Sequence, residues 1–126
     1  MAADALLRSM TMDRLRVLCM GLPEAEEVEA WDVPTFRVRN KIFAMARTGD
    51  GRLSVSCKAR RGVQDILVTS EPGRYYVPAY TGHNGWIGIW LDVDDDWDPA
   101  EDAILESYRM TAPKKLAAAI QNAASE

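Results

Sequence analysis

Reactive side chains are scarce in this sequence of 126 residues. It contains one histidine, His83, and two cysteines, Cys19 and Cys57. A catalytic site built on several histidines is therefore excluded, and two cysteines without CxxC spacing cannot form a disulfide framework. Because both cysteines fall on predicted apolar faces, one of a helix and one of a strand, we expect them to be buried packing residues.

Long apolar runs are missing as well. None approaches the roughly 20 residues that a membrane-spanning helix needs. The first ten residues include Asp4 and Arg8 and do not have the basic start and apolar stretch of a secretory signal. We therefore expect a cytoplasmic protein that does not bind membranes.

Cofactor and metal motifs are not found in the sequence. It lacks the phosphate-binding patterns GxxxxGK and GxGxxG. Alternate aspartates from Asp92 onward look like the start of a calcium loop, but Trp97 and Ala103 occupy the positions that need glycine and glutamate. We therefore predict no cofactor and no metal, and interpret this segment as an acidic turn that leads into a helix.

The composition is typical of a folded protein, with 48% hydrophobic and 27% charged residues. A chain of this length can bury one hydrophobic core. We therefore expect a single domain over residues 1–126.

Charge is distributed in blocks, although the net charge is only −4. Residues 92–106 carry eight acidic side chains and no basic one, whereas residues 35–61 carry eight basic side chains against Asp50. The basic ones are Arg37, Arg39, Lys41, Arg47, Arg52, Lys58, Arg60 and Arg61. Either the blocks neutralise each other across the folded surface, or the basic segment forms a face for an anionic partner.

Helical periodicity and end signals predict helices at about 11–20, 62–70, 99–110 and 113–123. Thr11 is the expected cap of the first helix. Asp98 is the expected cap of the third, followed by Pro99 and Glu101 in its first turn.

Alternating patterns and turn residues predict five strands, at 35–39, 42–47, 52–57, 74–77 and 86–91. The expected turns are Asn40–Lys41 and Thr48–Gly51, and the acidic residues 23–33 are interpreted as a connection. The predicted fold is a two-layer α+β domain of order α-β-β-β-α-β-β-α. Its five-stranded antiparallel sheet has helices on one face, and the polar side chains of the strands lie on the open face.

Three segments, in this order, resemble the MmcQ/YjbR family. The first is PTFRVRNKIFA at 34–44. The second is VPAY at 77–80, followed by GHNGW at 82–86 and LD at 91–92. The third is ESYR at 106–109, followed by APKKL at 112–116. The resemblance covers about residues 11–121.

This resemblance implies an α+β fold similar to the frataxin-like and secretion-chaperone-like group, and DNA binding through a double-wing motif. It implies no enzymatic activity. Asn40 stands where the family usually has glycine. The segment around His83 and Trp86 lacks the lysine or arginine often found there, which removes positive charge from a corner that nucleic acid would use.

The eight basic residues form the first candidate site, because two protruding hairpins offer spaced positive charge to phosphates. They predict weak, sequence-independent DNA binding. Two alternatives stay open, a solvated sheet face and a site for another anionic ligand or protein.

The second candidate site is the corner formed by Tyr80, His83 and Trp86, with Lys58 nearby. Such a corner suits a small-molecule or protein-interaction site. No nucleophile partners the single histidine, so we predict that the protein is not an enzyme.

Overall fold

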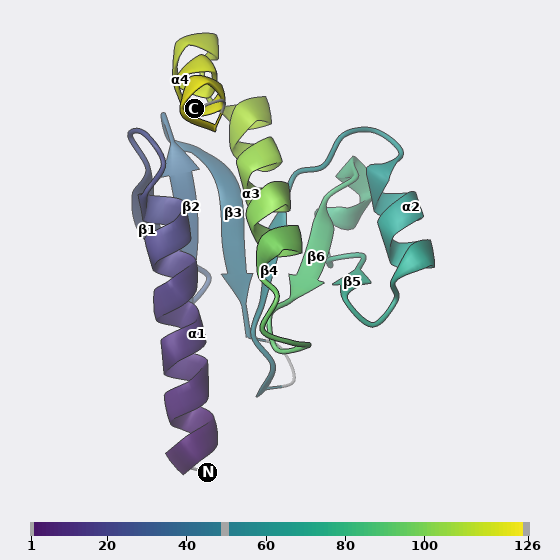
Figure 1. The fold of residues 1–126 in the computed structure, drawn as a ribbon. Helices are drawn as coiled ribbons and strands as arrows, with labels where there is room; N and C mark the ends of the chain where they lie inside the picture. Colours follow the sequence, from purple (N-terminus) through teal and green to yellow (C-terminus); the bar gives the residue numbers. More distant parts are fainter. Residues whose placement is uncertain (1, 49–50, 125–126) are drawn as a thin grey trace.

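The structure is a computed structural model, and it describes residues 2–48 and 51–124 (Figure 1). The helices are α1 (Ala2–Met20), α2 (Val63–Ser70), α3 (Asp98–Thr111) and α4 (Lys114–Ala124), with a short 3₁₀ helix at Gly82–Asn84. The strands are β1 (Glu26–Ala30), β2 (Val33–Val38), β3 (Lys41–Arg47), β4 (Ser54–Cys57), β5 (Tyr75–Tyr76) and β6 (Ile87–Trp90).

The six strands form one antiparallel sheet in the order β1-β2-β3-β4-β6-β5. The α-helices lie over one face of this sheet, and no α-helix of the described residues lies over the other face (Figure 1). Between the two layers, α1 contributes Leu15 and Cys19, and α3 contributes Ile104 and Tyr108, all with no exposed surface. The α+β class, the antiparallel sheet and the one-sided helices predicted from the sequence are confirmed.

The sequence prediction missed one strand. Residues 23–33 were expected to be a connection, but Glu26–Ala30 forms β1 and pairs with all of β2 except Val38. A tight turn joins the two strands, because Trp31 and Asp32 both have positive φ, 53° and 64°. Three glutamates in five residues hide the strand pattern, since an edge strand exposed to water needs no apolar alternation. The sheet therefore has six strands, and the order is α-β-β-β-β-α-β-β-α-α.

Three local predictions were displaced. The turn between β2 and β3 is Arg39–Asn40, not Asn40–Lys41, because both turn residues take positive φ, 51° and 67°. Helix α1 runs through Thr11, whose hydroxyl donates to the Leu7 carbonyl at 2.9 Å instead of capping the helix. Trp97 precedes α3 in the cap position and Asp98 is its first residue. Part of the predicted Thr48–Gly51 turn, residues 49–50, lies outside the described residues.

The helix-free face of the sheet is not the row of exposed polar side chains that was expected. Ser54 and Ser56 are buried, at 1% and 0% exposure. The Ser54 hydroxyl lies 2.6 Å from the Tyr76 hydroxyl, and Arg47 Nε donates to Ser56 Oγ at 3.1 Å. The Tyr76 ring packs across Gly88, where any β-carbon would clash with it. Large side chains such as Tyr76 and Arg47 therefore cover this face of the sheet, where no helix does.

Candidate functional site

Basic side chains gather at one end of the molecule, which we call the basic end. Strand β2 ends there, β3 begins there and β4 ends there, because neighbouring strands are antiparallel. Helix α3 ends and α4 begins at the same end (Figure 1). The basic end consists of Arg39, Lys41, Lys58, Arg60, Arg61, Arg109, Lys114 and Lys115.

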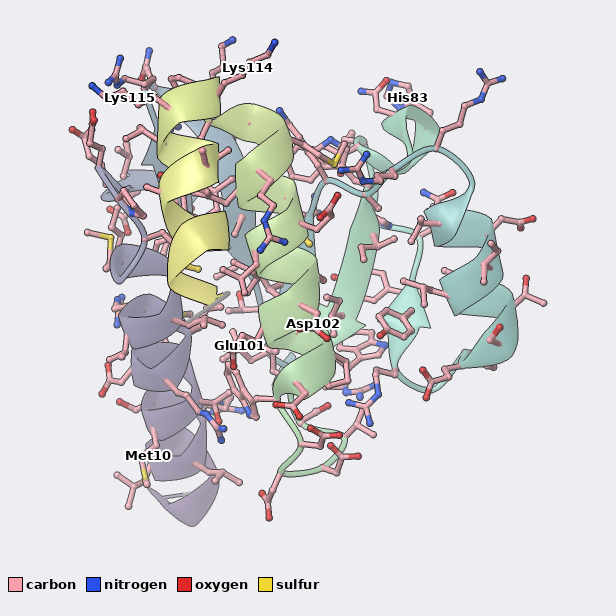
Figure 2. All side chains as sticks on the ribbon, turned by 45° about the horizontal axis from the view of Figure 1, so that its top comes forward. Met10, His83, Glu101, Asp102, Lys114 and Lys115 are labelled. Carbon is pink, nitrogen blue, oxygen red and sulfur yellow. The ribbon has the colours of Figure 1, made fainter. Side chains whose placement is uncertain are left out.

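The opposite end, which we call the acidic end, surrounds the start of α3. Its carboxylates are Asp92, Asp94, Asp95, Asp96, Asp98, Glu101 and Asp102. Figure 2 shows Lys114 and Lys115 at one end and Glu101 and Asp102 toward the other. The 14 residues of α3 separate the two ends by about 21 Å, at 1.5 Å per residue.

Ion pairs neutralise only part of the basic end. Arg39 donates two hydrogen bonds to the Glu24 carboxylate, of 2.7 and 3.0 Å, and these lower the pKa of the Glu24 carboxyl. Arg60 and Arg109 share Glu106. Within the part of the chain that the structure describes, five cations at this end form no ion pair: Lys41, Lys58, Arg61, Lys114 and Lys115.

Lys58 is the most constrained of these five cations. Its backbone N–H donates to Ser107 Oγ at 2.9 Å, and Ser107 Oγ donates to the Phe43 carbonyl at 2.6 Å. These bonds tie β4 and β3 to α3 at the point where Lys58 leaves the sheet. Burial lowers the pKa of the Lys58 ammonium, and the nearby charge of Lys41 lowers it further. An anion at this end would relieve that repulsion.

The dipole of α4 adds to the positive potential at the basic end, whereas the C-terminus of α3 at the same end opposes it. Helix α4 starts at the basic end with Lys114 and Lys115 and has no acidic residue in its first turn. Lysines at a helix N-terminus are placed against the dipole, which favours negative charge there. Nothing in this first turn offsets the charge, so an external anion would be stabilised.

Ion pairs at the acidic end involve arginines from other elements. Arg52 binds Asp92 through bonds of 2.9 and 2.7 Å, and its guanidinium lies 3.9 Å from the centre of the Trp90 ring. Arg74 binds Asp94 at 2.7 Å. Hydrogen bonds from these arginines lower the pKa of both aspartates.

The eight basic residues of the first candidate site are divided by the fold. Arg39, Lys41, Lys58, Arg60 and Arg61 lie at the basic end. Arg37 and Arg47 lie on the helix-free face, bonded to Thr35 and Ser56, and Arg52 lies at the acidic end. The β2–β3 and β3–β4 connections point in opposite directions, since they join opposite ends of β3.

The residues of the second candidate site are not gathered around one cavity. The Tyr80 side chain is 89% exposed on a backbone with φ 67°, and His83 is exposed on the 3₁₀ helix. Gln64 holds this corner against α2, donating to the Gly82 and Trp86 carbonyls at 2.8 and 2.6 Å. Lys58 lines a cavity between α2 and α3 that Tyr80, His83 and Trp86 do not line.

Sequence reasoning missed Arg109, Lys114 and Lys115 as members of the basic end. Residues 107–126 carry only a small positive excess, so charge counting along the chain gave no signal. The useful signal was topological, because a helix that starts after β6 and crosses the sheet must end beside the β2–β3 turn. The contacts of α3 with β3 and β4 establish that placement.

Both cysteines lie in the hydrophobic core. Cys19 and Cys57 are fully buried, and burial raises the pKa of both thiols, that of Cys57 to about 12. Among the described residues, no group of three His, Cys, Asp or Glu side chains could hold a metal ion. No helix in residues 2–48 and 51–124 is long and apolar enough to cross a membrane.

Comparison with known proteins shows the family of the chain and solved structures with a similar fold. The model of the family described as YjbR matches residues 20–110. The crystal structure of Deinococcus radiodurans protein DR2400, which carries the family-model domain DUF419, is similar with a TM-score of 0.70. It is 20% identical, over 79% of this chain and 76% of that one, a level that shows a shared fold alone.

One curated protein also shares a segment with this chain. The match is 36% identical over 62 residues to a histidinol-phosphate aminotransferase of Natronomonas pharaonis. It covers 48% of this chain and 18% of that enzyme. The chain therefore spans less than a fifth of that relative's length.

Proposed function

The chain belongs to the YjbR family, and from its geometry we propose that it binds DNA weakly and without sequence preference, through phosphates at the basic end. The binding involves no catalytic step.

The five unpaired cations carry this proposal. Lys41 begins β3, Lys58 and Arg61 lie between β4 and α2, and Lys114 and Lys115 begin α4, so the cations come from several elements that meet at this end. Figure 2 shows Lys114 and Lys115 at this end of the molecule. Contacts to phosphate need spaced donors and positive charge but no base-specific geometry. Arginines already held by Glu24 and Glu106 contribute less, because DNA would have to replace an existing partner.

Separation of the two ends supports the same proposal. The carboxylates of the acidic end would repel phosphate if they lay beside the cations. They surround the start of α3, whereas Lys114 and Lys115 follow the end of α3, about 21 Å away along the helix axis. The Debye length at physiological salt is about 8 Å, so that repulsion is largely screened.

The test is a fluorescence-anisotropy titration with labelled duplex and single-stranded oligonucleotides of unrelated sequences. We expect dissociation constants on the order of 10⁻⁴ to 10⁻⁶ M at physiological salt. Neutralising five phosphates gives a slope of log K against log salt of about −4.5 for duplex DNA and about −3.5 for single strands. All sequences should bind alike.

Two double variants with equal charge change locate the binding surface. Lys114→Gln/Lys115→Gln should weaken binding of every sequence and flatten the salt slope by about 2. The matched control, Arg8→Gln/Arg14→Gln, removes two exposed cations from α1 near the acidic end and should change little. Absence of binding at about 50 mM salt, or equal weakening by both variants, would contradict the proposal.

A further inference from the structure

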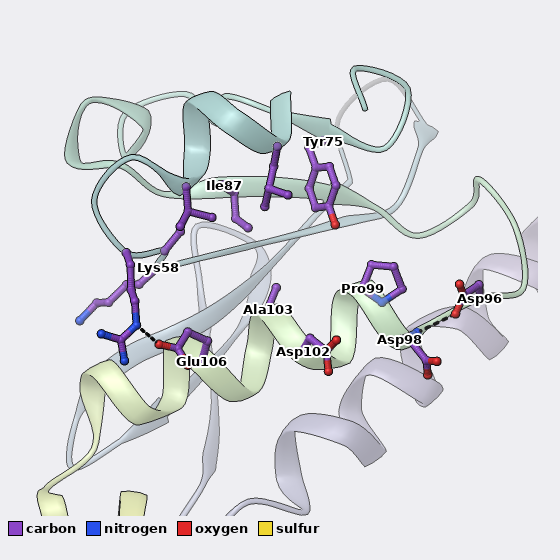
Figure 3. A pocket seen from close by; sticks show the side chains of 13 residues that line it. Lys58, Tyr75, Ile87, Asp96, Asp98, Pro99, Asp102, Ala103 and Glu106 are labelled. Carbon is purple, nitrogen blue, oxygen red and sulfur yellow. Dashed lines mark hydrogen bonds and ion pairs between the residues drawn. The ribbon is translucent and has the colours of Figure 1, made fainter. Parts of the chain in front are cut away.

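A groove runs between α2 and α3 on the helix-bearing side of the sheet (Figure 3). Its volume is about 610 Å³, within the range of small-ligand sites. Ala59, Val63, Leu67, Ile87 and Ala103 supply apolar lining.

The groove stays open because two of the residues that line it have small side chains. Ala59 and Ala103 have the smallest side chains that still carry a β-carbon. On α2, no residue is buried, although Val63, Ile66, Leu67 and Val68 are apolar. Of these, Val63 and Leu67 line the groove, and each leaves part of its apolar surface uncovered beside α3, at a cost of about 25 cal/mol for each Å² in contact with water.

Opposite charges mark the two ends of the groove. Lys58 and Arg60 line one end, where Arg60 forms an ion pair with Glu106. Asp96, Asp98 and Asp102 line the other end together with Tyr75 (Figure 3). From Asp98 to Glu106 is eight residues of helix, or about 12 Å.

We infer that this groove binds an extended peptide segment of a partner protein. The segment presents a basic side chain, an apolar side chain and an acidic side chain at alternate positions. The basic side chain lies by Asp98 and Asp102, the apolar one on Ala103 and Ile87, and the acidic one by Lys58.

The spacing supports a peptide. Alternate residues of an extended chain point to the same side, and each residue advances about 3.4 Å. The first and fifth residues are therefore about 14 Å apart, close to the distance of about 12 Å from Asp98 to Glu106, and the third falls midway over the apolar floor. This site overlaps the phosphate surface at Lys58 and also shares Arg60 with the basic end. Its apolar floor and its acidic end lie outside the phosphate surface.

The direct test is an NMR titration of the full chain with the peptide Arg-Ser-Leu-Ser-Glu, blocked at both termini. Amide shifts should move along α2 and α3 and leave β1 unchanged. Peptides with two arginines or two glutamates at the ends, or with serine in place of leucine, should bind at least about threefold more weakly.

Matched variants separate the groove from general surface effects. Ala103→Leu fills the floor and should weaken binding about tenfold, whereas Ala118→Leu on exposed α4 should not. Asp102→Asn should weaken binding about threefold, whereas Glu101→Gln on the next residue, which does not line the groove, should have no effect.

Three results would overturn the inference. One is the absence of shifts with the peptide at millimolar concentration. Another is equal binding by the peptides with like charges at both ends. The third is binding of ω-aminooctanoate as tight as that of the peptide, which would assign the groove to a small zwitterion. The variant Lys114→Gln/Lys115→Gln, which tests DNA binding, should give the same three peptide-binding results as the parent. Failure of the DNA proposal is therefore distinguishable from failure of this one.

Discussion

The two ends of α3 use charge in different ways. At the acidic end, the carboxylates of Asp92, Asp94 and Asp96 have local structural roles. Asp94 Oδ1 accepts the Asp96 N–H and Asp96 Oδ1 accepts the Asp98 N–H, both at 3.0 Å, and the helix dipole favours negative charge at this position. At the basic end, the five unpaired cations have no such partners in the described residues, and Lys114 and Lys115 oppose a helix dipole.

This difference separates charge that stabilises the fold from charge that is free for a partner. A sum over the chain cannot make that distinction, since the net charge of −4 hides both ends. Carboxylates that accept backbone bonds are explained by the folded chain alone. Burial and the nearby charge of Lys41 both lower the pKa of Lys58, and none of the ion pairs among the described residues offsets this repulsion.

The largest expected effect comes from the side chain that shapes the basic end. Tyr108 is fully buried, packs edge-on against Phe43 with ring centres 5.3 Å apart, and donates to the Pro23 carbonyl at 2.6 Å. Tyr108→Ala should reduce the free energy of unfolding by about 3–5 kcal/mol, measured by urea denaturation.

Tyr108→Phe separates the hydrogen bond from the packing. It should cost about 1–2 kcal/mol, because the Pro23 carbonyl loses its donor while the ring remains. A loss below about 1 kcal/mol for Tyr108→Ala would mean that the basic end does not depend on this contact.

A smaller, pH-dependent effect is expected at the acidic end. The hydrogen bond from Arg52 lowers the pKa of Asp92 from its ordinary 3.8. The pair therefore stabilises the fold above that value, and the contribution disappears as the pH falls through the lowered pKa. Arg52→Gln should lose less than about 1 kcal/mol at neutral pH, since both side chains are partly exposed.

The measurement is thermal unfolding of the parent and of Arg52→Gln at pH 7 and at about pH 2. The difference between them should shrink at the lower pH. The part due to stacking of Arg52 on Trp90 should remain. Arg8→Gln, an exposed neighbour without an ion pair in the described residues, is the control, and a difference that grows on acidification contradicts the assignment.

The smallest effect tests the separation of the ends directly. Asp94→Asn/Asp95→Asn/Asp96→Asn should change DNA affinity by less than about twofold at 150 mM salt, because the distance exceeds two Debye lengths. At about 10 mM salt, where the Debye length is about 30 Å, the same variant should bind more tightly than the parent. Clear strengthening at both salt concentrations would show that the two ends are electrostatically coupled.

The sequence predicted those elements whose side chains meet the core. Periodic apolar residues such as Leu15, Ile104 and Ile89 located most helices and strands within a few residues, although α1 begins at Ala2, nine residues before its predicted start. Strand β1 was missed because backbone pairing, not side-chain burial, holds it in place. The predicted β2–β3 turn was wrong by one residue. Asn40 indicates a tight turn, but it can form the turn with Arg39 as well as with Lys41.

The candidate site was predicted less well than the fold. Residue types identified the basic segment, but the antiparallel sheet sends Arg52 and Arg39 to opposite ends and adds Lys114 from far along the chain. Which cations are free depends on single carboxylates such as Glu24 and Glu106. Neither fact is written in local sequence patterns.

Strand β1 has a consequence for the behaviour of the protein at high concentration. It forms one edge of the sheet, and its unpaired backbone groups are a template on which another molecule could add a strand. Glu26, Glu27 and Glu29 line that edge, so a second β1 would bring like charges together. The opposite edge, β5, is only two residues long. The glutamates of β1, which made this strand hard to predict from the sequence, thus oppose the growth of the folded sheet into fibrils.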